Sequence, residues 1–190
     1  MNSNIKSVLS KIGKTLNKNN IMWVVGGSII LNHNDIVCEV NDIDIIIEEN
    51  DFEKVILLLK QFGIKKSVSD KLNFHTKKYV KMNIDGVFID LMAGFIIEHE
   101  NGLYNYVFDQ DAITSLMNIN NILVPIGAIE DWYIIYQVIG GREKKVELLD
   151  NYLKNVQDIN SKLLIRTLEQ DLPISVIDNI NKLLQFGREK

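Results

Sequence analysis

The stretch that most constrains the fold runs from Trp23 to Glu48 and reads WVVGGSIILNHNDIVCEVNDIDIIIE. It contains a short apolar strand, a Gly-Gly-Ser turn, a run that could form a helix, and a second strand that opens with Asp-Ile-Asp. Because side chains alternate between the two faces of a strand, Asp42 and Asp44 project to the same side, about 7 Å apart. Carboxylates directed at one spot repel each other, and a divalent cation is the simplest partner that keeps both ionised.

The turn Gly26-Gly27-Ser28 is a second candidate site. Glycine lets the backbone approach a ligand closely and adopt positive φ. A serine at the start of the following helix adds a hydroxyl beside free N–H groups, where phosphate oxygens can bind. The alternative is a plain strand-to-helix turn in which Ser28 only caps the helix, and the three residues taken alone favour that alternative.

A third candidate is Asp90, which lies in the apolar run VFIDLM after an Asp85-Gly86 pair. Asp-Gly between two strand-like runs is a strong hairpin signal. In the second arm Asp90 shares its face with Phe88 and Met92, and a charge among apolar neighbours is costly unless it has a partner. Two interpretations stay open for Asp90: a partnered functional carboxylate, or a residue on an exposed face of the sheet.

Hydrophobic spacing predicts the remaining elements. We expect a loop with short extended pieces over 98–105 and a turn or two of helix over 110–117. The α/β pattern changes to helices near residue 125, so we expect an α/β (α+β) core over 1–125, with a small mixed sheet flanked by helices, and a helical region over 126–190 packed on it. Helices are expected over 5–16, 52–62, 129–139, 146–153, 159–168 and 174–184, and strands over 21–25, 42–48, 64–68, 74–84, 87–92 and 122–125.

Composition narrows the functional classes. The net charge is −4, so no global positive field attracts nucleic acid. The single Cys38 cannot form an internal disulfide, which is typical of a reducing compartment. No signal-peptide pattern and no run of about 18 apolar residues is found, so we expect a cytoplasmic protein. The three histidines share no ligand spacing, which argues against a zinc site: His33, His75 and His99.

The candidate residues form a pattern when they are taken in chain order. Their motifs are Val25-Gly26-Gly27-Ser28, Asp42-Ile43-Asp44 and Ile89-Asp90-Leu91. Over roughly residues 20–95 this pattern resembles the nucleotidyltransferase superfamily of DNA polymerase beta. The helix pair that follows is similar to one in small bacterial members, which include minimal, antibiotic-modifying and toxin–antitoxin-associated transferases; its motifs here are Ile129-Glu130-Asp131-Trp132 and Gly140-Gly141-Arg142-Glu143-Lys144.

The resemblance implies transfer of a nucleoside monophosphate from a nucleoside triphosphate, with ATP as the expected donor, to a hydroxyl group, with release of pyrophosphate. The acceptor could be a small molecule, RNA or protein, and the small size and negative charge favour a small molecule such as an aminoglycoside or lincosamide antibiotic. The implied roles are binding of two Mg²⁺ ions, or Mn²⁺ as a substitute, by Asp42, Asp44 and Asp90, activation of the acceptor hydroxyl by Asp90, and phosphate binding by Gly26, Gly27 and Ser28.

The chain also departs from the family pattern. Cys38 and Val40 stand where small members often carry Arg and Thr, and Tyr136 stands where a helix Lys would contact the triphosphate. The departures motivate an alternative, a catalytically inactive module that binds a nucleotide or a protein on the same fold. A glycosyltransferase that uses Asp-x-Asp is a third possibility, but it usually needs a larger donor-binding domain. Compensating cations could come from Lys78, Lys81 or Arg142.

Overall fold

The computed structural model describes residues 1–36, 39–66 and 75–188. Within these ranges the strands form a seven-stranded sheet and a separate two-stranded hairpin. The hairpin consists of β6 (Ile96–His99) and β7 (Gly102–Asn105). The sheet consists of β1 (Trp23–Val25), β2 (Asp42–Ile47), β3 (Gly63–Lys66), β4 (Lys78–Ile84), β5 (Val87–Ala93), β8 (Ile113–Ile119) and β9 (Ile122–Gly127).

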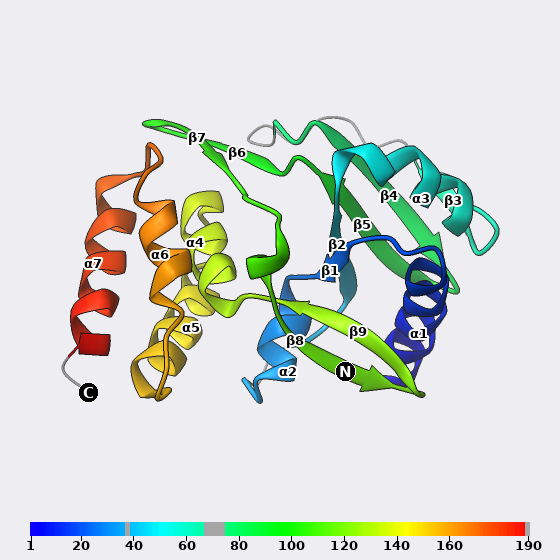
Figure 1. Cartoon of the computed structure of the whole chain (residues 1–190), viewed down its shortest axis with the longest axis horizontal. Helices are drawn as coiled ribbons and strands as arrows, with labels where there is room; N and C mark the ends of the chain where they lie inside the picture. The colour runs from blue at the N-terminus through cyan, green and yellow to red at the C-terminus, as the bar shows by residue number, and fades with distance from the viewer. Residues whose placement is uncertain (37–38, 67–74, 189–190) are drawn as a thin grey trace.

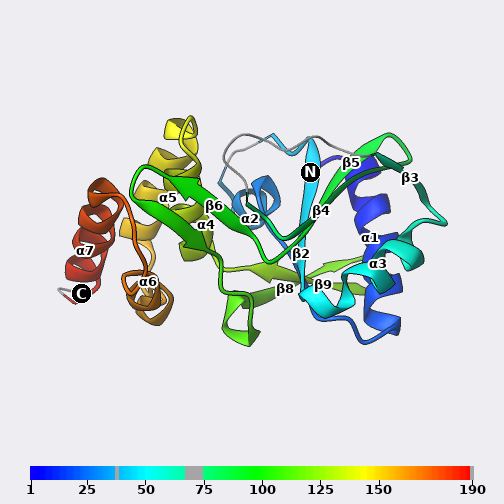
Figure 2. The same cartoon turned by 90° about the horizontal axis from the view of Figure 1, so that it is seen from above.

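The helices flank this sheet and continue beyond it. The helices α1 and α3 pack on each other near the sheet, whereas α4 to α7 are grouped at the opposite end of the molecule (Figures 1 and 2). A sheet flanked by helices with further helices after it confirms the predicted fold class. The bounds are α1 (Ser3–Lys18), α2 (Ser28–His33), α3 (Phe52–Leu59), α4 (Ile129–Ile139), α5 (Glu143–Asn155), α6 (Ser161–Thr167) and α7 (Ile174–Arg188), with 3₁₀ turns at Glu49–Asp51 and Gln110–Ala112.

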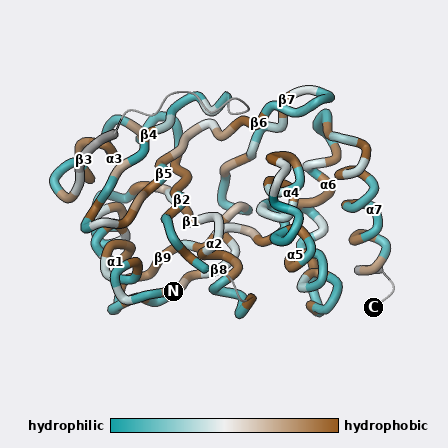
Figure 3. The backbone as a smooth tube through the Cα atoms, turned by 180° about the vertical axis from the view of Figure 1, so that it is seen from behind, coloured by the Kyte–Doolittle hydropathy of each residue, from teal (hydrophilic) through white to brown (hydrophobic). Residues whose placement is uncertain are grey.

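The first helix shows how local sequence sets these elements. The Asn2 side chain accepts a hydrogen bond from the Ile5 backbone N–H at 2.9 Å and so caps α1. Apolar residues three and four positions apart are buried on one face of the helix. That face packs against the sheet, and hydrophobic stretches run through both α1 and β5 (Figure 3). The buried residues of α1 include Ile5, Val8, Leu9, Ile12 and Leu16.

The sheet is mixed, and its strand order decides which residues meet. The order is β3-β4-β5-β2-β1-β9-β8. β2 is parallel to β5 and β1 is parallel to β9, while the other neighbours are antiparallel. The register places Asp44 opposite Asp90 and Val25 opposite Ile45, so the first half of β2 lies between the end of β1 on one side and β5 on the other.

The predicted Asp-Gly hairpin is confirmed. β4 and β5 pair antiparallel from Ile84↔Val87 outward. Both turn residues have positive φ, 50° at Asp85 and 83° at Gly86, as a two-residue type I′ turn requires. The parts of the predicted strands 64–68 and 74–84 that fall on 67, 68 and 74 lie outside the described residues.

Of the two predictions between the hairpin and the helices, one is confirmed in part and one needs correction. The short extended pieces expected over 98–105 belong to the two strands of the β6–β7 hairpin, which begins earlier, at Ile96. Residues 110–117, expected to be helical, form one 3₁₀ turn and then enter β8. Burial in β8 alternates residue by residue and β8 pairs antiparallel with β9, so a period of two prevails over the short helical pattern.

The helical region does not stand apart from the strands that precede it. β9 ends at Gly127 and α4 begins at Ile129. The Asn105 backbone N–H donates to Gln170 Oε1 at 2.8 Å, so the β6–β7 hairpin contacts the connection between α6 and α7. The division at residue 125 stays a prediction. No helix in the described part of the chain is both long and apolar enough to cross a membrane.

Candidate functional site

The three predicted carboxylates lie on two adjacent parallel strands. Asp42 and Asp44 are half-buried on one face of β2, while Ile43 and Ile45 are fully buried on the other. Asp44 and Asp90 are direct partners in the register between β2 and β5. Residues paired in this way have their side chains on the same face of the sheet, so the strand pairing brings the three acidic residues to one surface.

The hydroxyl group of Tyr79 on β4 is affected by all three carboxylates. Its hydroxyl donates to Asp90 Oδ1 at 2.7 Å. Burial and this hydrogen bond raise the pKa of Tyr79 well above its ordinary value, and the negative charges of Asp90, Asp44 and Asp42 raise it further. All three carboxylates are therefore close enough to act on one hydroxyl group.

Asp90 is buried and partnered, which excludes the exposed-face interpretation of its strand position, while its functional role stays a prediction. Its exposed fraction is 7%. Lys81 Nζ lies 3.3 Å from Asp90 Oδ1, and the same nitrogen is 5.3 Å from the centre of the Phe88 ring. Lys81 therefore contacts the acidic cluster, as one of the three suggested compensating cations. Lys78 instead donates to the Glu49 carbonyl at 3.1 Å.

The glycine turn lies directly against Asp44. Gly27 has φ +63°, and a Cβ atom there would lie 1.9 Å from Asp44 Oδ2. The Gly26 backbone N–H donates to the Asp44 carbonyl at 3.0 Å. A Cβ at Gly26 would lie 1.9 Å from the Trp132 ring on α4. Both glycines are thus needed for close approach: Gly27 toward the acidic strand and Gly26 toward the helical region.

The residue that the sequence did not reveal is Lys145. Its Nζ donates to the Ser28 hydroxyl at 2.9 Å and to the Tyr136 hydroxyl at 3.2 Å, and it lies 4.7 Å from the centre of the Tyr136 ring. Ser28 itself begins α2 and has an exposed fraction of 8%. The available signal was weak, because Lys145 stands one residue beyond the Gly-Arg-x-Lys motif that ends at Lys144.

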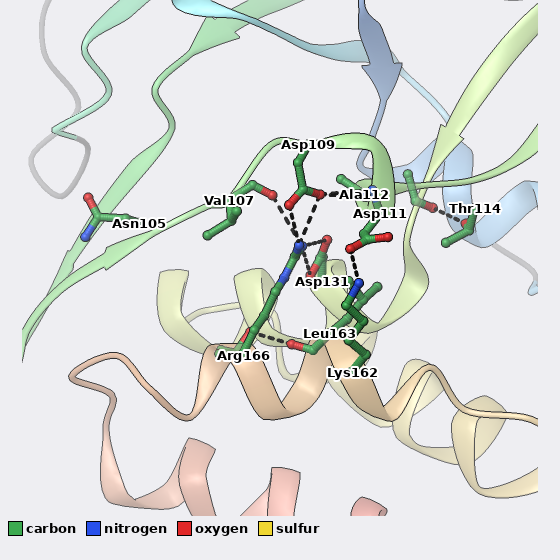
Figure 4. A network of polar contacts seen from close by, with 12 residues as sticks. Asn105, Val107, Asp109, Asp111, Ala112, Thr114, Asp131, Lys162, Leu163 and Arg166 are labelled. Carbon is green, nitrogen blue, oxygen red and sulfur yellow. Dashed lines mark hydrogen bonds and ion pairs between the residues drawn. The ribbon is translucent and has the colours of Figure 1, made fainter.

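An ionic network anchors the start of α4 (Figure 4). Arg166 on α6 contacts Asp131 at 3.1 Å and Asp109 at 3.2 Å. Asp131 precedes Trp132, whose ring packs on Gly26, and burial raises the pKa of Asp131 to about 7 against the attraction of Arg166. The acidic pair at the start of α4 thus has a structural use: Asp131 binds Arg166, and Glu130 Oε1 accepts from the Asn160 backbone N–H at 2.8 Å.

The carboxylate oxygens of Asp42 and Asp44 are the kind of hard ligand that Mg²⁺ prefers. Among the residues that the structure describes, no group of three or more His, Cys, Asp or Glu side chains is arranged to hold a metal by itself. Mg²⁺ is usually bound by one or two carboxylates and completes its octahedral shell with water and substrate phosphates. The hard oxygens of Asp42 and Asp44 beside the Gly27 turn fit that shared mode of binding, in which a nucleotide supplies the other ligands.

A mixed sheet that carries a Gly-Gly-Ser turn beside Asp-x-Asp, with a third aspartate on the neighbouring parallel strand, defines the nucleotidyltransferase fold of the polymerase beta type. Residues 8–151 match the aminoglycoside-2''-adenylyltransferase family, and the chain belongs to that family. The resemblance inferred from the motifs is thereby confirmed. No curated protein matches the sequence significantly.

Solved structures agree with this fold. A Thermotoga maritima protein described as a nucleotidyltransferase is 24% identical, with a TM-score of 0.63 over 82% of this chain and 96% of its own. The crystal structure of ANT(2'')-Ia in complex with adenylyl-2''-tobramycin is 10% identical, with a TM-score of 0.57 over 96% of this chain and 98% of its own. The solution structure of the antibiotic-resistance factor ANT(2'')-Ia has a TM-score of 0.56 at 12% identity, over 80% of this chain and 86% of its own.

Proposed function

We propose that this protein transfers a nucleoside monophosphate from a nucleoside triphosphate, with ATP as the donor, to a hydroxyl group of a small molecule. The observation that carries the proposal is the contact between Asp44 and Gly27, which joins the acidic strand to the phosphate-binding turn. A turn that binds phosphates and carboxylates that bind cations have a common use when the ligand is a metal-bound triphosphate. Family membership supports the same reaction class.

The proposed reaction is an in-line displacement at the α-phosphorus. The acceptor oxygen forms a bond to phosphorus, the bond to the bridging oxygen of the leaving pyrophosphate breaks, and the acceptor proton passes to the Asp90 carboxylate. Asp42 and Asp44 hold the cation, while Gly26, Gly27 and Ser28 hold the phosphates. When bound, Mg²⁺ neutralises the charge that develops on the phosphate oxygens, and Mn²⁺ has the same preference for oxygen ligands.

Lys81 has a defined part in this proposal. In the free protein its ammonium lies 3.3 Å from Asp90 Oδ1 and offsets part of the cost of burying that side chain. Asp90 must exchange the Lys81 contact for the acceptor hydroxyl or the cation before it can accept a proton. Lys81 is half-buried on β4 and its stem is flexible, so it can move without a change in the strand.

A small acceptor is supported by two observations. The net charge of −4 suits an acceptor that carries amino groups, and it does not suit a long polyanion such as RNA. ANT(2'')-Ia, which shares the fold, has been solved with an adenylylated aminoglycoside. We therefore place hydroxyl groups of aminoglycoside-like molecules first among acceptors to be tested.

The proposal is tested by replacing each carboxylate of the Asp-x-Asp motif. Asp42→Asn and Asp44→Asn remove a metal-binding charge and change the side-chain volume little, so we expect pyrophosphate release to fall by at least about 10²-fold while the thermal unfolding midpoint changes little. Pyrophosphate release is measured with MgATP over a panel of aminoglycosides and other hydroxyl acceptors. The exposed Asp178 on α7 provides the matched control, Asp178→Asn, which should retain full activity.

Full activity of both motif variants would show that the metal assignment is wrong. Binding of MgATP by the wild type without pyrophosphate release over the whole panel would favour the inactive nucleotide-binding module instead.

A further inference from the structure

The structure places an ammonium group beside Ser28 in the proposed phosphate-binding turn. Lys145 Nζ contacts two hydroxyl groups, those of Ser28 and Tyr136. Across the described chain, no carboxylate lies within ion-pairing distance of Lys145, whereas Lys81 pairs with Asp90 in the same region. A half-buried cation surrounded by neutral acceptors is stabilised when an anion binds beside it.

The turn between two helices brings Lys145 to this position. α4 ends at Ile139, and Gly140 and Gly141 follow with φ of 70° and 63°, values that glycine adopts without strain. α5 begins at Glu143, so Lys145 falls in its first turn and folds back beside Tyr136 on α4. The aromatic ring and hydroxyl of Tyr136 then hold the ammonium in front of Ser28.

The donor count leaves room for a ligand. An ammonium group has three N–H donors, and the described residues offer Lys145 two acceptors. The Ser28 hydroxyl accepts from Lys145 and keeps its own hydrogen for donation. The Lys145 ammonium and the Ser28 hydroxyl, which lie 2.9 Å apart, can therefore both donate to one phosphate group.

We propose that Lys145 binds the terminal phosphates of the nucleoside triphosphate and replaces, from α5, the helix lysine that the family pattern places at Tyr136. Tyr136 is then the residue that positions this ammonium. This inference rests on the proposed function, because it assigns a ligand to the same nucleotide site. The proposed role belongs to Lys145 and not to Arg142. Arg142 is exposed and lines a cleft between α4, α5 and α7.

The test compares nucleotides that differ in their terminal phosphates. Binding of MgATP and of AMP is measured by calorimetry for the wild type, Lys145→Ala, Lys145→Gln and Lys145→Arg. We expect the alanine and glutamine variants to bind MgATP roughly tenfold to a hundredfold more weakly, since a hydrogen bond to a charged group is lost. AMP binding should not change, and arginine should restore part of the affinity for ATP.

A matched control lies on the same helix. Lys144→Ala removes an equal charge from the adjacent, exposed position and should leave both affinities unchanged. Tyr136→Phe removes only the hydroxyl that holds the ammonium, and we expect a smaller loss for MgATP than in Lys145→Ala. Thermal unfolding of each variant shows whether it is folded, and Lys145→Gln retains most of the side-chain length if alanine destabilises α5.

The outcomes separate this inference from the proposed function. Equal weakening of ATP and AMP, or no weakening of either, overturns the role of Lys145 while nucleotide transfer can still stand. Selective loss of ATP affinity in a protein that transfers nothing supports Lys145 and overturns the transferase. A wild type that binds no ATP overturns both.

Discussion

At the residue scale, the site depends on the space that Gly27 leaves for Asp44. The Asp44 carboxylate lies where a side chain at position 27 would begin, so the acidic strand and the glycine turn can approach each other only because glycine is present. The positive φ of Gly27 is a second, separate requirement. The two requirements can be tested apart, because other glycines in the chain meet only one of them.

We expect Gly27→Ala to impair nucleotide binding as well as stability. The new methyl group would displace the Asp44 carboxylate, and the positive φ would add strain of about 1–3 kcal/mol. Gly86→Ala is the control, because Gly86 also has positive φ but a Cβ there would meet nothing within 4 Å. Unfolding by denaturant should show a loss in both variants, while calorimetry with MgATP should show a loss only in Gly27→Ala. Normal ATP binding by Gly27→Ala would mean that Asp44 does not need this contact.

At the scale of elements, α4 links the helical region to the glycine turn. Its first turn carries Asp131, held by Arg166 from α6, and then Trp132, packed on Gly26. The Arg166 contact to Asp109 extends the network to the loop before β8. An acidic pair that looks like a family signature in the sequence thus anchors a helix in the structure.

Because of this network, we expect the free energy of unfolding to depend on pH through the titration of Asp131. The pKa of Asp131 is about 7 in the folded protein against an ordinary value of 3.8, so between these values the folded chain holds a proton that the unfolded chain has lost. The free energy of unfolding should therefore fall as pH rises through this window. We expect Asp131→Asn to show a flatter dependence there than the wild type, measured by denaturant unfolding at several pH values.

An exposed aspartate outside the network supplies the comparison for this experiment. Asp178→Asn on α7 should keep the slope of the wild type. Identical slopes in the wild type and Asp131→Asn would contradict the assignment to Asp131.

At the scale of the whole molecule, contacts join the helical region to the sheet at several places. Trp132 packs on Gly26, Lys145 reaches Ser28, and the β6–β7 hairpin bonds to the connection between α6 and α7. A division of the chain at residue 125 would cut between Pro125 and Ile126, although Ile126 pairs with Val25 in the sheet. We propose that the two regions behave as one folding unit despite their different composition.

Native-state hydrogen exchange tests that proposal. The amides of α4 should open with the same free energy as those of β1 and β2, because unfolding of α4 would expose the Trp132–Gly26 contact and the charge of Arg166. Exchange of α4 to α7 at a distinctly lower free energy would instead establish the boundary near residue 125 as a boundary between separate units.

Local sequence rules are enough to predict the strongly periodic secondary structure and the order of the motifs. The capped first helix, the Asp-Gly hairpin and the Asp-x-Asp strand follow from local rules, since helix caps, turn φ values and side-chain alternation involve residues only a few positions apart. Those rules also place Asp42 and Asp44 on one face of β2. They failed over 110–117, where pairing with β9 outweighs the local pattern.

The contacts between charged residues far apart in the chain become visible only in the folded structure. Lys145 reaches Ser28 across 117 positions in the chain, Lys81 rather than Lys78 contacts Asp90, and Arg166 joins Asp109 to Asp131. Such contacts depend on strand register and on how helices pack, and neither is encoded in a local period. The motifs therefore predict a site for phosphates and a cation, and the contact between α5 and the start of α2 determines which lysine lies at the predicted phosphate turn.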